Sequence, residues 1–184
     1  MIYQDLWLNG KLLKRGNREC ASRYKVIHDF CLNNKPMNIL DIGANMCYFG
    51  IRLIEDFDCF VVAFEFDHFD MRMNHVKNNK TKKLMLLNRK LKLEDISILS
   101  SCCSFDLVLA MSVLHHCPGN TQEWIKAIRS LGENIIIEFA LDDSKRTGIR
   151  KDYFIPHGAK TLGYGISHLK EDIKRPIVLL KGLK

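Results

Sequence analysis

The stretch Asn38-Ile39-Leu40-Asp41-Ile42-Gly43-Ala44-Asn45-Met46-Cys47 decides the fold. A short, continuous apolar run predicts a buried strand over residues 37–42, because only a strand covered on both faces lacks alternating polar positions. The acid Asp41 lies at the end of this run, and Gly43 follows in a tight turn before a helical pattern over residues 46–56. Open α/β sheets bind nucleotide-like ligands at such a strand end.

Three residue types in this turn suit a nucleoside ligand. Gly43 lets the backbone approach the ligand without a side chain in the way, so valine at this position is expected to abolish binding and leave the chain folded. Asn45 tolerates left-handed backbone angles better than most residues. Asp41, at the carboxyl end of the strand, can face the ammonium group of a bound amino acid directly or through water.

Short apolar runs and helical patterns alternate on both sides of this segment. The runs predict strands over 59–64, 84–87, 105–111, 134–139 and 175–181, and the 3.6-residue periodicity predicts helices over 20–33, 69–76 and 120–131. Asn120 caps the last of these helices, with Glu123 completing a capping box. Strands that alternate with helices indicate right-handed βαβ units and a mostly parallel sheet with helices on both faces.

The expected organisation is therefore a single α/β domain over residues 1–184. Residues 1–36 form an N-terminal arm and helix, residues 37–141 form the core, and residues 142–184 form a loop and a closing strand. The part after the fifth strand is short, and residues 142–165 read as a long loop with at most one short helix.

Polar residues also lie at the ends of three further predicted strands. Glu65 ends the second strand, where an acid accepts hydrogen bonds from both ribose hydroxyls, and Asp67 is the backup candidate. The segment Phe105-Asp106-Leu107-Val108-Leu109-Ala110-Met111-Ser112-Val113-Leu114-His115-His116 is an apolar strand followed by two histidines. Glu138 ends the fifth strand; it could touch the substrate, although a solvated or helix-facing acid is the somewhat stronger interpretation.

Together these motifs resemble the class I S-adenosylmethionine-dependent methyltransferases. The stretch from Asp41 is similar to the D-I-G-A-N variant of the family's first motif, although Cys47 stands where the fullest pattern has glycine, and residues 113–116 repeat the family's V-L-H-H phrase. The resemblance covers residues 17–139 and, loosely, 175–181. It implies a Rossmann-like fold and S-adenosyl-L-methionine as cofactor.

The resemblance also implies roles for individual residues. Asp41, Gly43, Asn45, Glu65, Asp95 and Ser112 would bind the cofactor, with Asp95 near the adenine amino group. An ordinary acid at a helix start is an equally good interpretation of Asp95. His115 and His116 would lie beside the methyl group and its acceptor, with His115 expected to be the nearer, and either could act as a base near neutral pH.

Composition limits the compartment and the partners. The seven cysteines are odd in number and have no C-x-x-C spacing, which favours a reducing, cytoplasmic setting without disulfides. No signal peptide, membrane span or metal-ligand cluster is visible. The net charge of +7 makes nucleic acid a candidate partner, and a merely lysine-rich surface is about equally well supported. The acceptor, a small molecule or RNA, and the oligomeric state stay open.

Two alternatives come from other classes. A nicotinamide dehydrogenase uses the same fold, but its G-x-G-x-x-G turn is not matched, because Gly43 stands alone. A non-catalytic relative that binds RNA or a protein partner through the basic segments 11–23 and 77–92 is the stronger alternative.

Overall fold

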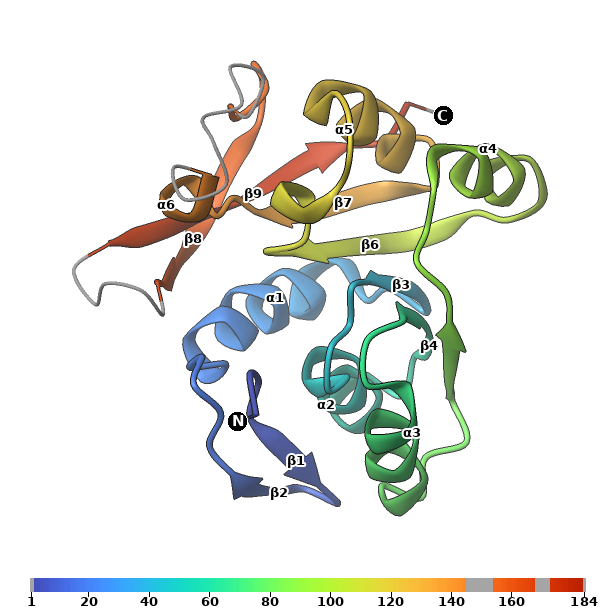
Figure 1. Cartoon of the computed structure of the whole chain (residues 1–184), viewed down its shortest axis with the longest axis vertical. Helices are drawn as coiled ribbons and strands as arrows, with labels where there is room; N and C mark the ends of the chain where they lie inside the picture. Colours follow the sequence, from blue (N-terminus) through green and yellow to red (C-terminus); the bar gives the residue numbers. More distant parts are fainter. Residues whose placement is uncertain (1, 145–153, 168–172, 184) are drawn as a thin grey trace.

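The computed structural model describes residues 2–144, 154–167 and 173–183, and they form one sheet of seven strands and a separate two-stranded hairpin (Figure 1). The strands are β1 (Leu6–Leu8), β2 (Lys11–Lys14), β3 (Asn38–Ile42), β4 (Phe60–Glu65), β5 (Leu84–Asn88), β6 (Phe105–Met111), β7 (Gly132–Glu138), β8 (Lys160–Ile166) and β9 (Lys174–Lys181). The helices are α1 (Ala21–Asn34), α2 (Tyr48–Phe57), α3 (Phe69–Asn78), α4 (Leu93–Cys102), the 3-10 turn η1 (Leu114–His116), α5 (Thr121–Arg129) and α6 (Leu141–Ser144).

The sheet order is β5-β4-β3-β6-β7-β9-β8, and the five strands β3 to β7 run parallel. The strand β9 is antiparallel to both β7 and β8. The mostly parallel α/β sheet expected from the sequence is thus confirmed. From β3 the chain first builds outward to β4 and β5, and then crosses back to add β6 on the other side. Such a reversal opens a crevice at the carboxyl ends of the two central strands.

The core has two layers because each central strand buries both of its faces. Leu107 and Leu109 of β6 pack in one cluster with α1 and α2, whereas Val108 and Ala110 of the same strand pack in a second cluster with α4 and α5. The helix α3 lies on the α2 side through a smaller cluster. This two-sided burial explains why the strands read as continuous apolar runs.

The expectation of a loop over residues 142–165 is wrong in its last part, where β8 begins at Lys160. This strand was missed because it carries two glycines, which weaken strand propensity. Both glycines allow a close approach: a Cβ at Gly163 would lie 2.6 Å from Val26 Cγ2 of α1, and one at Gly165 would lie 2.3 Å from Glu138 Oε1. Residues 145–153, also part of the expected loop, lie outside the described residues.

The N-terminal arm forms the β1–β2 hairpin, which docks on α2. The Trp7 indole N–H donates to Glu55 at 2.6 Å, and the Gly10 amide donates to the same carboxylate at 2.9 Å. The Arg52 guanidinium lies 4.2 Å from the Trp7 ring centroid and 4.0 Å from that of Tyr24, which adds cation–π attraction. Within the described residues, no helix has both the length and the apolar character that a membrane span requires.

Candidate functional site

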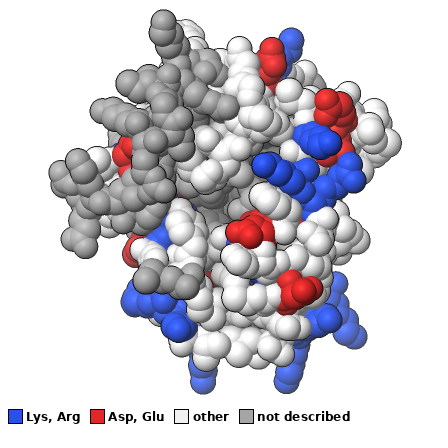
Figure 2. All heavy atoms as spheres, in the orientation of Figure 1, with Lys and Arg blue, Asp and Glu red and all other residues white. Residues whose placement is uncertain are grey.

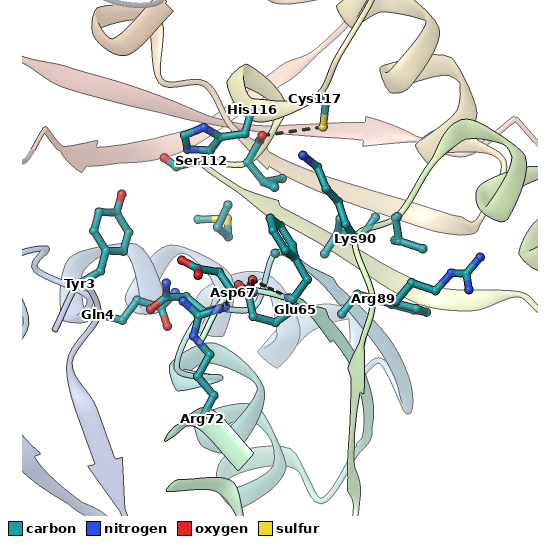
Figure 3. A pocket seen from close by; sticks show the side chains of 18 of the residues that line it. Tyr3, Gln4, Glu65, Asp67, Arg72, Arg89, Lys90, Ser112, His116 and Cys117 are labelled. Carbon is teal, nitrogen blue, oxygen red and sulfur yellow. Dashed lines mark hydrogen bonds and ion pairs between the residues drawn. The ribbon is translucent and has the colours of Figure 1, made fainter. Parts of the chain in front are cut away.

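A cavity of about 410 Å³ lies where β3, β4 and β6 end (Figure 3). Its size falls in the range typical of small-molecule sites. Its walls come from the N-terminal arm, the turn after β3, the loops after β4 and β5, and the segment after β6. The described residues that line it are Tyr3, Gln4, Ile42, Gly43, Asn45, Phe64, Glu65, Phe66, Asp67, Arg72, Arg89, Lys90, Leu91, Met111, Ser112, Val113, His116, Cys117, Pro118 and Trp124.

The turn after β3 has an irregular backbone. Gly43 has a φ of +70°, and Asn45 and Cys47 have φ values of +52° and +57°, so two non-glycine residues adopt left-handed angles here. A Cβ at Gly43 would lie 2.6 Å from Cγ2 of Val113. Gly43 is therefore needed for the fold, and a valine here would destabilise the protein, contrary to the expectation that this variant stays folded.

Glu65 ends β4, is 8% exposed and lines the cavity. Its Oε2 accepts from the Asn45 amide at 2.9 Å, and its Oε1 accepts from the amides of Phe66 and Asp67 at 2.8 and 3.2 Å. The Arg72 guanidinium lies 2.7 Å from Oε1. The carboxylate is held in a fixed orientation at the cavity wall by these donors, and it ties the turn after β3 to the turn after β4.

Asp41 lies behind the cavity wall and is 1% exposed. Burial, and then the nearby charge of Glu65, raise the pKa of Asp41 to about 7. Its Oδ2 is a buried oxygen that has no hydrogen-bond partner within the described part of the chain. An unsatisfied buried carboxylate oxygen costs free energy, and such a cost is often retained where a ligand supplies the missing donor.

The segment after β6 contributes Ser112 and His116 to the cavity wall. Ser112 has a φ of +55°, and its hydroxyl donates to Glu138 Oε2 at 2.6 Å. His116 is exposed, whereas His115 is 8% exposed and contacts the His116 ring in a tilted arrangement, with ring centroids 3.9 Å apart. Of the two histidines it is thus His116 that faces the cavity, because the one turn of 3-10 helix rotates its neighbour toward the core.

Asp95 is not among the residues that line the cavity. It lies at the third position of α4, where its carboxylate accepts from the Lys92 amide at 2.9 Å and pairs with Arg89, which does line the cavity. This geometry is that of an acid at a helix start, which is the second interpretation of Asp95 given above. Asp95 is connected to the cavity indirectly, through its ion pair with Arg89.

A buried ionic cluster at the end of β7 was missed by the sequence reasoning. Glu138 is fully buried rather than solvated, and it pairs with Arg18 at 2.6 Å and with Arg23 at 3.3 Å. Arg175 of β9 is also fully buried, and it donates to the Ser112 hydroxyl at 3.4 Å. Burial opposes ionisation of Glu138, but the charges of Arg23 and Arg18 outweigh it and lower its pKa. Three arginines spread over 157 positions of sequence give no local motif that could have revealed the cluster.

The N-terminal arm supplies one wall of the cavity. Tyr3 and Gln4 line the cavity, and the side-chain oxygen of Gln4 accepts from the Met46 amide at 3.1 Å.

The surface charge is unevenly distributed. Lys and Arg side chains gather along the lower edge of the face drawn in Figure 2, the side of β1, β2 and α3, whereas charges of both signs surround the cavity.

The chain was compared with known proteins by sequence and by structure. No protein-family model matches it, and no curated protein is significantly similar to it. The bifunctional kinase-methyltransferase WbdD superposes with a TM-score of 0.73 at 17% identity over 90% of this chain, which spans only 40% of that chain.

Two smaller structures agree over more of their length. A candidate O-methyltransferase from Klebsiella pneumoniae gives a TM-score of 0.65 at 14% identity, over 88% of this chain and 80% of the other. The N-terminal domain of EvdMO1, determined in the presence of SAH and D-fucose, gives 0.63 at 14% identity over 98% and 91%. At these identities the likeness concerns the fold: the chain has the Rossmann-like fold of methyltransferases in one small domain.

Proposed function

We propose that the protein is an S-adenosylmethionine-dependent methyltransferase. One observation supports this most: a single cavity at the carboxyl ends of β3, β4 and β6 joins the glycine turn, Glu65, and the Ser112–His116 segment. These are the segments on which the family resemblance rests, and they come together from three separate parts of the chain.

The chemistry of the residues fits such a cofactor. The unsatisfied Oδ2 of Asp41 could accept from an ammonium group, directly or through water, which would relieve the cost of its burial. Glu65 lies at the cavity wall, and its carboxylate could accept hydrogen bonds from ribose hydroxyls. It would do so in addition to the bonds that it already accepts from backbone amides. The cavity of about 410 Å³ accommodates a ligand of that class.

When bound, the cofactor supplies a methyl group that its sulfonium already makes reactive. The protein therefore has to bind the acceptor, align it with the methyl group and exclude water, and such positioning is worth about 7–11 kcal/mol. His116, exposed on the cavity wall, is the candidate base that takes a proton from a hydroxyl or amine acceptor. The buried His115 ring would support it by packing against it.

Calorimetry with S-adenosylhomocysteine tests the proposal without knowledge of the acceptor. Glu65→Gln keeps the shape of the side chain and removes its charge, and we expect binding to weaken roughly ten- to a hundredfold, the value of a charged hydrogen bond. Glu94→Gln on α4, an exposed acid outside the cavity, is the matched control and should bind like the wild type. Absence of binding by the wild type at millimolar ligand would overturn the proposal.

The acceptor then follows from a screen of labelled methyl transfer to RNA, protein and metabolite pools. The alternative, a non-catalytic module that binds RNA or a protein through its basic surface, makes a different prediction. Such a module would bind RNA with a steep salt dependence and transfer no label to any pool.

A further inference from the structure

One buried acid connects two walls of the cavity. Glu138 is 0% exposed at the end of β7. Its Oε2 accepts from the hydroxyl of Ser112, which lines the cavity, and its Oε1 accepts from Arg18 Nη2, each at 2.6 Å. Arg18 and Ser112 belong to segments that are far apart in the sequence, so Glu138 fixes the position of one relative to the other.

Arg18 extends this connection to the N-terminal wall. Its Nη1 donates to the Tyr3 hydroxyl at 3.1 Å, and its backbone amide donates to the Tyr3 carbonyl at 2.9 Å. Tyr3 lines the cavity, and in Figure 3 its hydroxyl points toward the side of the cavity that carries Ser112 and His116. The adjacent Gln4 bonds to the turn after β3, so the arm contacts the proposed cofactor turn as well.

Stability alone is a poor explanation for this arrangement. Removing a guanidinium and a carboxylate from water costs several kcal/mol per ion, and apolar residues of similar volume often stabilise a core as well or better. A planar guanidinium has another use, since its rigid fork can hold two partners at fixed positions. Arg18 does this for Glu138 and Tyr3.

We propose that Arg18 and Glu138 are positioning residues, which hold the Tyr3 hydroxyl and Ser112 on two walls of the cavity in the geometry that binds S-adenosylhomocysteine. This inference rests on the proposed function. Neither residue lines the cavity, so neither is a catalytic residue; both act through the two hydroxyls that do.

Arg23 provides a matched control. It is 1% exposed and pairs with the same carboxylate, through Glu138 Oε2 at 3.3 Å. Its other bonds go to the Glu19 carbonyl and the Cys20 thiol, away from the cavity wall. Arg18→Met and Arg23→Met therefore each remove one buried guanidinium from Glu138, but only Arg18→Met also removes the hydrogen bond from Nη1 to the Tyr3 hydroxyl.

The test measures the affinity for S-adenosylhomocysteine by calorimetry and the melting temperature of each variant. Arg18→Met should weaken binding about tenfold, as expected for loss of a hydrogen bond to a charged group, whereas Arg23→Met should stay within about twofold. Both should lower the melting temperature, because each leaves a buried charge less well paired. Equal losses of affinity in the two variants would show a purely structural cluster.

A gentler pair of variants keeps the test valid if Arg18→Met does not fold. Arg18→Lys keeps the charge beside Glu138 but loses the fork, and Tyr3→Phe removes only the hydroxyl. Each should weaken binding about two- to tenfold, and their combination should be no worse than either alone, because they break the same connection. Fully additive losses, or unchanged affinity in Tyr3→Phe, would contradict the inference. If the wild type itself does not bind, the proposed function is wrong and the inference falls with it, whereas wild-type binding with equal arginine variants rejects the inference alone.

Discussion

Asp41 is buried at the end of β3 with a pKa of about 7, raised first by burial and then by the charge of Glu65. An unfolded chain binds the same proton with a pKa near 3.9, so the folded state takes up the proton more readily. Stability due to this group is therefore full below pH 4 and is lost as the pH rises from about 4 to about 7. At about 1.36 kcal/mol per pKa unit, the ionised form costs on the order of 4 kcal/mol above pH 7.

A bound ammonium group would reverse this cost, which gives a pH prediction. Because the ammonium favours the charged carboxylate, affinity for S-adenosylhomocysteine should rise between pH 6 and pH 8, by up to about tenfold per pH unit below the pKa. Asp41→Asn should flatten this profile, bind more weakly at pH 8, and melt at a higher temperature than the wild type there. Calorimetry and thermal unfolding across this pH range check all three results, and a profile that keeps its slope in the variant would exclude Asp41 as the titrating group.

The two histidines are expected to respond differently to removal. His116→Ala deletes the exposed ring on the cavity wall and should lower turnover by at least about tenfold, within the usual contribution of a general base, with little effect on stability. His115→Ala deletes a buried, packed ring and should mainly lower the melting temperature. The measurement is activity per folded molecule with the acceptor found by the labelled-methyl screen. Similar losses from both would mean that neither ring acts as the base.

Sequence reasoning predicted which residues lie at the strand ends, and three of these residues come together at one cavity. Gly43 follows β3, Glu65 is the last residue of β4 and Ser112 follows β6, and all three line the cavity, since parallel strands end at one edge. The direction of side chains in short turns could not be predicted, because neighbouring residues of a 3-10 turn point in different directions. One can line the cavity while the next is buried in the core. For this reason the expectation that His115 is the nearer of the two histidines does not match the cavity wall, which His116 lines.

The edge strand β8 is hard to recognise in the sequence because it carries glycines, and the same glycines allow it to pack closely against its neighbours. A Cβ at Gly165 would lie 2.3 Å from Glu138 Oε1 and 2.9 Å from the side chain of Arg23, both of which are fixed by their ion pair. We expect Gly165→Ala to destabilise the protein by about 1–3 kcal/mol, the usual cost of overpacking. Thr161→Ala, exposed on the same strand, should change stability by less than about 0.5 kcal/mol. Denaturant unfolding of both variants measures the difference, and equal stabilities would mean that the cluster can shift aside.

The strands that were predicted correctly are those with continuous apolar runs, because burial on both faces leaves that pattern in the sequence. The strand β8 lacks it, since several of its side chains are exposed and glycine occupies the positions next to α1. The arm before α1 was expected to be a strand-like segment or a loop, and it forms the β1–β2 hairpin together with a stretch that bridges Gln4 and Arg18.

At the scale of the whole molecule, the alternation of strands and helices sufficed to predict the mostly parallel sheet, which the topology confirms. The ionic cluster could not be predicted, because it depends on contacts between residues that are distant in the sequence. Arg18 and Glu138 are separated by 120 residues, and only the completed sheet brings them together. Basic residues that seemed to belong to a surface segment, Arg18 and Arg23, are in fact buried.

This long separation affects the order of events during synthesis. The arm is translated before β7, which carries the acid that anchors Arg18. Closing so large a loop carries an entropic cost that must be met before the contact forms. Until then, Arg18 and Arg23 lack the carboxylate with which both pair in the folded chain. A wall of the cavity that is translated early thus waits for a residue that is translated late, so a nascent chain that stops before residue 138 should hold no closed binding site.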